Sequence, residues 1–203
     1  MDVDWLTEGA EVFTGNAYLL HGDRTTLVDP GAMEGISTLL EERTRELDAV
    51  VLTHQHPDHV AELDAIVEAF SPAVYAFDEH RLRTEALADG DTVRMGEDRF
   101  DVRHTPGHAD DHVVLVSERT LFSGDVVVYE DGAFSDGSFG RTDMAGQSRE
   151  TLIRSIEGLL DALPPSVESL YAGHGAPYHG DVRSVVERAL KRAKRLEPKY
   201  PDD

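Results

Sequence analysis

Three histidines and an aspartate lie within six consecutive residues, in the run His54-Gln55-His56-Pro57-Asp58-His59. This run directly follows the apolar segment 49–53, for which we expect a buried strand. Side chains repeat every two residues in an extended segment, so the imidazoles of His54 and His56 point the same way and can reach one ion. If a helix begins near Pro57, its first turn projects the aspartate and the last histidine toward a neighbouring point. The run therefore predicts a site for two metal ions side by side.

Three further candidate ligands lie in loops that follow apolar segments, each near a glycine: His108 in HTPGH, Asp125 in LFSGDVVV and His174 in YAGHG. Glycine permits a positive φ and a close approach of the backbone, so it can turn a loop sharply enough to aim a ligand into a shared cleft. The chain has no cysteine, so a metal must be bound by histidine and carboxylate side chains. These ligands suit zinc, iron or manganese rather than calcium.

The segments that must position these residues alternate between strand and helix patterns. Period-two alternation and short apolar runs predict a hairpin over 10–29 and strands over 49–53, 73–77, 92–95, 99–105, 112–128 with a turn at 117–119, and 167–172. Helical periodicity predicts helices over 34–46, 60–70, 79–88, 148–162 and 181–197. Two halves of similar size result. We expect an α/β fold with two sheets covered by outer helices.

The charge of the chain is strongly negative. Its 203 residues carry 40 acidic and 19 basic side chains, for a formal net charge of −21. Self-repulsion of this size is tolerable where the Debye length has fallen to about 3 Å, at molar salt. The composition therefore resembles that of proteins from salt-in halophiles, such as halophilic archaea. A negative field also repels phosphate backbones, so we expect no nucleic-acid partner.

Length and hydropathy limit the class of protein further. No apolar run approaches the roughly 18 residues that span a bilayer, and no basic segment leads into an apolar stretch at the N-terminus. The absence of cysteine excludes disulfide scaffolds and thiolate metal sites. We expect one domain over residues 1–203 in a non-exported, cytoplasmic protein without a membrane partner. The oligomeric state stays open.

The order of these motifs resembles the metallo-β-lactamase superfamily. The matching positions are Asp29 in LVDPG, the 54–59 run, His108, Asp125 and His174. The resemblance implies a four-layer αββα sandwich of two mixed sheets flanked by helices, and a pair of metal ions. It implies a first ion held by His54, His56 and His108, and a second held by Asp58, His59 and His174. Asp125 would bridge the two ions, and Asp29 would orient a ligand histidine.

Within the superfamily, two segments resemble glyoxalase II and its short relatives: HTPGHADDH and the GRTD element over 140–143. Asp111 replaces a glycine usual in the first element, while His112 keeps its place outside the ligand set. The chain ends soon after His174, without the helical domain with which full-length glyoxalase II grips glutathione. The resemblance implies a thioesterase-like metallo-hydrolase with two metal ions, most simply zinc. Asp58 and Asp125 would orient the hydroxide that attacks the thioester.

Other reactions stay open at this point. The GRTD element also resembles persulfide dioxygenases, which bind one iron on the equivalents of His54, His108 and Asp125. Lesser alternatives are a β-lactamase, another ester or phosphodiester hydrolase, and a metal-binding module without catalysis. Oxygen uptake with a persulfide distinguishes the dioxygenase from the hydrolase.

Four further residues are candidates for substrate binding. Arg141 and Tyr178 lie on loops expected to face the cleft. Arg188 and Arg192 belong to a basic stripe on the last predicted helix, which either is a solvated helix face or binds an anionic substrate. The expected partner is a small molecule, an acidic thiol conjugate whose thiol and acyl groups the sequence does not identify.

Overall fold

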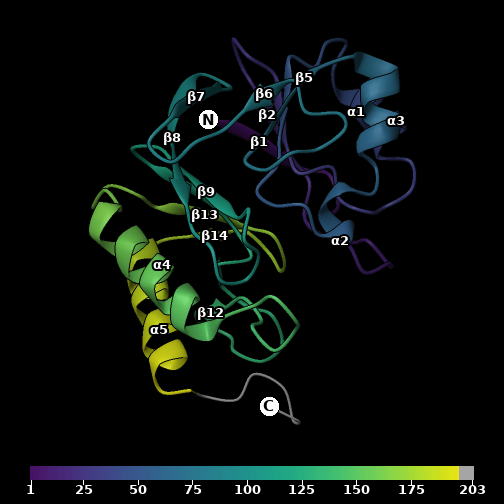
Figure 1. Ribbon diagram of the computed structural model, residues 1–203. Helices are drawn as coiled ribbons and strands as arrows, with labels where there is room; N and C mark the ends of the chain where they lie inside the picture. Colours follow the sequence, from purple (N-terminus) through teal and green to yellow (C-terminus); the bar gives the residue numbers. More distant parts are fainter. Residues whose placement is uncertain (197–203) are drawn as a thin grey trace. The chain divides into compact units, whose positions relative to one another are not determined.

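The computed structural model describes residues 1–196 (Figure 1). The chain clusters into two compact units, one over Met1–Phe100 and one from Asp101 onward. The division matches the two halves expected from the pattern of strands and helices, while one domain over the whole chain stays a prediction. The last residue of the helix predicted over 181–197 lies outside the described residues.

The first unit contains a six-stranded mixed sheet. Its order is β1 (Asp2–Trp5), β2 (Tyr18–His21), β3 (Thr26–Val28), β4 (Ala49–Val51), β5 (Ala73–Ala76) and β6 (Glu85–Ala86). The first three strands pair antiparallel, and β3 to β6 pair parallel. The predicted hairpin is confirmed by β2 and β3. Strands β3 and β4 are buried along their whole length, as is typical of parallel strands covered on both faces.

Helices α1 (Ile36–Arg43) and α3 (Leu63–Phe70) cover this sheet (Figure 1). Each buries residues three or four positions apart, Ile36 and Leu40 in α1 and Leu63 and Ile66 in α3. This spacing puts the buried side chains on one face of the helix. They pack with strand residues such as Val50 in one apolar cluster. The helices predicted over 34–46 and 60–70 are thus confirmed, although the second begins only at Leu63, after the short helix α2 (Pro57–Val60).

The prediction of a helix over 79–88 is wrong. Glu85 and Ala86 instead form β6, which pairs parallel with Tyr75 and Ala76 of β5. The amide of Leu87 then donates to the carbonyl of Ala76 at 2.9 Å. The free edge of β5 offers hydrogen bonds that outweigh the weak local preference of this segment for helix.

The second sheet also has six strands and mixed pairing. Its order is β14 (Tyr178–His179), β13 (Ser169–Ala172), β10 (Thr120–Gly124), β9 (Val113–Val116), β8 (Asp98–His104) and β7 (Thr92–Met95). The boundary between the two units falls within β8. A separate two-stranded sheet is formed by β11 (Val127–Val128) and β12 (Ser138–Phe139). The short strands β1, β12 and β14 were missed by the sequence patterns, because strands of two to four residues carry little periodicity. Strand β11 lies within the segment predicted over 112–128.

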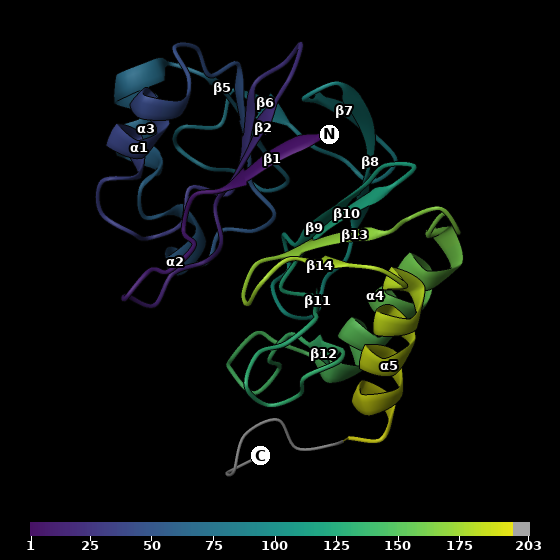
Figure 2. The ribbon, with the colours of Figure 1, turned by 180° about the vertical axis from the view of Figure 1, so that it is seen from behind.

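Helices α4 (Arg149–Ala162) and α5 (Val182–Lys194) pack together in the second unit (Figure 2). Ser148 caps α4 by accepting the amide of Thr151, and Asp181 caps α5 by accepting the amide of Ser184. The buried faces of both helices join one apolar cluster with strands β9, β10 and β13. Among residues 1–196, no helix is long and apolar enough to cross a membrane.

Strand direction decides which loops meet within each unit. In the first unit β3 and β4 are parallel neighbours, so Asp29 and Thr53, which follow them, lie at one edge of the sheet. In the second unit β10 is parallel to β13 and antiparallel to β9, which is antiparallel to β8. Strands β8, β10 and β13 therefore run the same way. The loops that carry His108, Asp125 and His174 follow these three strands at one edge.

Candidate metal centre

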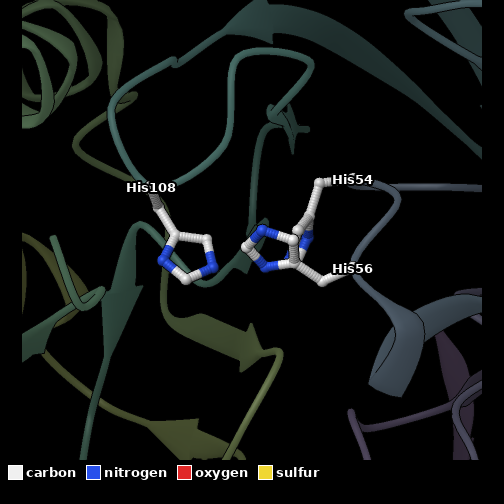
Figure 3. A group of neighbouring side chains, drawn as sticks. All are labelled: His54, His56 and His108. Carbon is white, nitrogen blue, oxygen red and sulfur yellow. The ribbon is translucent and has the colours of Figure 1, made fainter. Parts of the chain in front are cut away.

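The first unit brings His54 and His56 together in the loop between β4 and α2. Nε2 of His54 lies 3.1 Å from Nδ1 of His56, and Figure 3 shows both side chains leaving the loop in the same direction. Two ligand atoms bound tetrahedrally at about 2.0–2.1 Å from one zinc ion lie about 3.3–3.4 Å apart. The spacing of the two nitrogens is thus close to that of two ligands of one ion.

Helix α2 presents the second half of the same run. Pro57 occupies its first turn, and the preceding His56 is extended, with φ −64° and ψ 145°. Asp58 Oδ2 lies 3.8 Å from Nε2 of His59. The predicted helix start at Pro57 is confirmed, and it places Asp58 and His59 beside one another as predicted.

The buried carboxylate of Asp29 orients His59 directly and His54 through Thr53. Asp29 accepts the ring N–H of His59 at Nδ1, over 2.9 Å, and the hydroxyl of Thr53 at 2.6 Å. The Thr53 oxygen in turn lies 3.1 Å from Nδ1 of His54. Because the Thr53 hydrogen points to Asp29, its oxygen accepts from His54. These hydrogen bonds fix both rings with Nδ1 as the donor, so Nε2 is the nitrogen that each ring could offer to a metal ion. The role of Asp29 toward a bound metal stays a prediction.

Gly15 lies against the same residues, and the sequence patterns did not indicate it. Its amide donates to the carbonyl of Asp58 at 2.8 Å. A Cβ at Gly15 would lie 2.8–2.9 Å from three ring atoms of His59, closer than carbon atoms approach without a clash. A residue with a side chain would therefore displace the His59 ring. Thr53 was also missed, although it directly precedes the histidine run.

The second unit brings its three predicted ligands together around one carboxylate oxygen. Oδ2 of Asp125 lies 3.3 Å from Nε2 of His108 and 3.4 Å from Nε2 of His174. Both distances match the edge of a tetrahedral coordination sphere, about 3.3–3.4 Å. His108 and Asp125 are buried, while the His174 side chain is 24% exposed. A carboxylate between two histidines has the geometry of a bridging ligand.

Backbone groups orient His108. The carbonyl of Arg141 lies 3.0 Å from its Nδ1, so this nitrogen carries the hydrogen and Nε2 is the nitrogen that could bind a metal ion. The side-chain amide of Gln147 donates to the main-chain carbonyl of His108 at 2.9 Å. Gly140 packs against the main chain of Asp125, since a Cβ at Gly140 would lie 2.1 Å from the Asp125 carbonyl oxygen. The GRTD element thus packs directly on two predicted ligands.

His112 contacts the main chain of Asp125. Its Nε2 accepts the main-chain amide of Asp125 at 3.0 Å, and its Nδ1 lies 3.0 Å from the hydroxyl of Thr105. The ring is fully buried. His112 therefore holds the backbone at Asp125, as expected for a histidine outside the ligand set.

The four candidate substrate residues have protein partners in the structure. Arg141 makes two hydrogen bonds to Asp143, and the guanidinium holds the pKa of that carboxyl below its usual value. Tyr178 stacks on Tyr129, with ring centroids 4.2 Å apart. The last two, Arg188 and Arg192, contact Asp136. Their roles toward a substrate stay predictions.

Each unit contains residues that fit the ligands of a metal centre. The donor set is imidazole and carboxylate without sulfur, which suits zinc, iron or manganese. Each neighbouring pair of donor atoms, His54 with His56 and Asp125 with either of its histidines, lies 3.1–3.4 Å apart. Hydrogen bonds fix the ring nitrogen that His54, His59 and His108 present.

Comparisons with known proteins agree with these features. A hydroxyacylglutathione hydrolase of Chromohalobacter salexigens is 33% identical over 157 residues, which are 75% of this chain and 57% of that protein. The chain spans 46–61% of the length of three such curated relatives. Among solved structures, the BLEG-1 B3 metallo-β-lactamase is 27% identical with a TM-score of 0.74, covering 97% of this chain and 100% of that one. ETHE1 from Myxococcus xanthus shares the fold, with 23% identity, a TM-score of 0.75 and coverage of 100% and 94%.

The family model described as metallo-β-lactamase superfamily matches residues 10–200. The match takes in all the motif positions, from Asp29 to His174. The two mixed sheets flanked by helices are also those of the solved relatives. The chain therefore belongs to the metallo-β-lactamase superfamily.

Proposed function

We propose that the protein is a metal-dependent hydrolase that cleaves a thioester. The observation that carries the proposal is the place of Asp125, whose Oδ2 lies 3.3 Å and 3.4 Å from the ligand nitrogens of two histidines. One carboxylate oxygen between two imidazoles suits a pair of ions rather than one. The relatives named hydroxyacylglutathione hydrolase support the choice of a thioester among possible substrates.

The proposed ligand set draws on both units. His54, His56 and His108 would hold the first ion, Asp58, His59 and His174 would hold the second, and Asp125 would serve as a shared ligand. The local geometry of each unit and membership of the superfamily support this assignment. Zinc is the expected metal, with iron or manganese as alternatives.

The metal ions, when bound, lower the pKa of water and so supply a hydroxide nucleophile at neutral pH without a serine or cysteine. Asp58 and Asp125 would orient the nucleophile toward the thioester carbonyl by accepting its hydrogen. Asp29 and the Arg141 carbonyl keep the ligand nitrogens of His59 and His108 in place. A thiol with a pKa of about 8.5 leaves as the thiolate, so the proposed reaction needs no strong acid assistance.

The proposed substrate is a small acidic thiol conjugate. Arg141 and Tyr178 follow the ligand loops and are proposed to contact it, and Arg188 and Arg192 are candidates to bind its anionic groups. The thiol carrier and the acyl group stay open, because the chain spans only 46–61% of three curated relatives.

Metal content and a substrate panel test the proposal together. We expect about two metal equivalents per chain by elemental analysis and turnover of acyl-thiol esters, assayed at low and at molar salt because of the net charge of −21. His59→Ala and His174→Ala should each lower both metal content and kcat, since each removes a ligand. His179→Ala is the matched control, an exposed histidine five residues from His174.

Two results would contradict the hydrolase. Full turnover by the His59 and His174 variants would show that the second ion is not needed. Retention of two metals without turnover on thioesters, esters, phosphodiesters or a β-lactam would indicate a metal-binding module without catalysis.

Persulfide oxidation is the second candidate function. The observation that favours it is the pair His108 and Asp125, which with His54 would supply the two-histidine, one-carboxylate set typical of mononuclear iron oxygenases. About one iron per chain, with oxygen uptake on addition of a low-molecular-weight persulfide, would replace the hydrolase assignment.

A further inference from the structure

Helix α5 holds the segment between β11 and β12 through two arginines. Nε of Arg188 donates to the main-chain carbonyl of Asp136 at 2.6 Å and lies 3.3 Å from its Oδ2. Nη2 of Arg192 donates to Oδ1 of Asp136 at 2.6 Å, and its Nη1 donates to the carbonyl of Gly137. The Arg192 guanidinium also lies 4.6 Å from the ring centroid of Phe134. We call residues 131–137 the clamped loop.

The clamped loop is ordered by its own residues as well. Oδ1 of Asp131 accepts the amides of Ala133 and Phe134, and its Oδ2 accepts the hydroxyl of Ser138 at 2.7 Å. Gly137 has φ +135°, and a Cβ there would lie 2.7 Å from the carbonyl oxygen of Val185 in α5. The loop backbone is therefore packed directly on the helix at this point, where only glycine fits.

After the clamped loop, the chain continues to Arg141, whose main-chain carbonyl contacts the proposed metal ligand His108. Strand β12 follows, and then Gly140, whose amide donates to the carbonyl of Val126 at 3.3 Å. The carbonyl of Arg141 lies 3.0 Å from Nδ1 of His108. Only four residues separate Asp136 from Arg141. A displacement of the loop relative to α5 is thus transmitted over a short, hydrogen-bonded segment to the group that orients His108.

We propose that Arg188, Arg192 and Asp136 are positioning residues for His108, acting through the clamped loop and the Arg141 carbonyl. The inference rests on the proposed metal centre, and it assigns the two arginines a role other than binding an anionic substrate. A planar guanidinium can donate to a carboxylate and a carbonyl at once, which a lysine ammonium does less well in fixed geometry. Arg192, with its two acceptors and its ring contact, is the central member.

The test compares Asp136→Asn and Arg192→Lys with Lys191→Met. Lys191 is an exposed residue of the same helix, and its replacement removes one charge from α5 without touching the clamped loop contacts described above. Metal transfer to a chelator measures how well His108 is held. We expect transfer to be roughly 10-fold faster in the two clamp variants, the lower end of the range for outer-sphere ligand supports, and unchanged in the control.

Steady-state kinetics separate positioning from substrate binding. A positioning role lowers kcat by a similar factor for anionic and neutral thioesters, with KM little changed. A rise of KM confined to anionic substrates, with metal transfer at the wild-type rate, would overturn the inference and return the arginines to substrate binding.

Amide hydrogen exchange tests the contacts of the clamped loop without relying on bound metal or on activity. In the protein stripped of metal, we expect the amides of Gly137 and Gly140 to exchange roughly 10-fold faster in Asp136→Asn than in Lys191→Met, since weakened loop contacts permit local opening. Equal amide exchange rates in the two variants would overturn the proposed role of Asp136 in holding the clamped loop, even if the wild type binds two metals. Wild-type protein that binds no metal would instead remove the proposed function, and the exchange result would still decide whether the clamp exists.

Discussion

The two units of the molecule support their candidate ligands by different means. In the first unit the ligands are contiguous in the chain, and a buried carboxylate, Asp29, orients them through His59 and Thr53. In the second unit three ligands come from three separate loops, and His108 is oriented by a main-chain carbonyl. Orientation by a side chain depends on the identity of one residue. Orientation by a carbonyl depends on the path of the backbone, and thus on glycines and on contacts outside the site.

The glycines give the sharpest test of this difference. Gly140→Ala should destabilise the protein by about 3 kcal/mol, since its Cβ would lie 2.1 Å from a backbone oxygen of Asp125. Gly15→Ala meets the His59 ring, a side chain, and should cost about 1–2 kcal/mol while lowering metal affinity. Denaturant unfolding with and without chelator measures both effects.

Gly158 provides the matched control. It lies within α4, and a Cβ there would meet no atom within 4 Å. Gly158→Ala should therefore stabilise the protein by about 0.5–1 kcal/mol through its helix preference. A Gly140→Ala protein as stable as the wild type would contradict backbone packing as the support of Asp125.

Asp29 and Arg141 separate the two modes of orientation directly. Asp29→Asn should weaken metal binding by about 10–100-fold. Oδ2 of Asp29 accepts from His59 and the Thr53 hydroxyl, while Oδ1 accepts the Thr53 main-chain amide, and the NH2 of an asparagine cannot replace an accepting oxygen. Arg141→Ala keeps the carbonyl that faces His108 and should change metal affinity by less than about 3-fold. Competition with a chromogenic chelator measures both constants. Equal losses in the two variants would show that the Arg141 side chain, rather than its carbonyl, supports the site.

The smallest expected effect is on stability as a function of pH in the second unit. The hydrogen bond from Arg192 holds the pKa of the Asp136 carboxyl below its usual value. A carboxyl with a lowered folded-state pKa contributes stability above its unfolded pKa, and this stability is lost as the pH falls through the folded pKa.

Asp136→Asn should therefore lower the free energy of unfolding by less than about 1 kcal/mol at neutral pH, since the pair is partly exposed. The difference from the wild type should shrink toward zero below about pH 4. Urea unfolding at pH 7 and pH 3.5 measures it. If the difference in the free energy of unfolding grew as the pH fell, it would contradict a stabilising contact between Arg192 and the Asp136 carboxylate.

The sequence alone predicted most of the elements and named the candidate ligands that the structure groups within each unit. The 54–59 run needed no tertiary information, because period-two alternation and a helix start at Pro57 already place its side chains. Helices α4 and α5 were equally clear, since their apolar stripes are long enough to carry a period. The resemblance to the superfamily supplied the assignment of Asp29, which no local pattern indicates.

Tertiary structure decided what depends on neighbours distant in the chain. The 79–88 segment became a strand because the edge of β5 was available to pair with it. Strand direction brought the loops after β8, β10 and β13 to one edge, and so placed His108 and His174 on either side of Asp125. The partners of Arg188 and Arg192 were decided in the same way. A basic stripe read along the sequence is equally suited to a substrate and to a loop, and only the packed chain shows that Asp136 lies beside it.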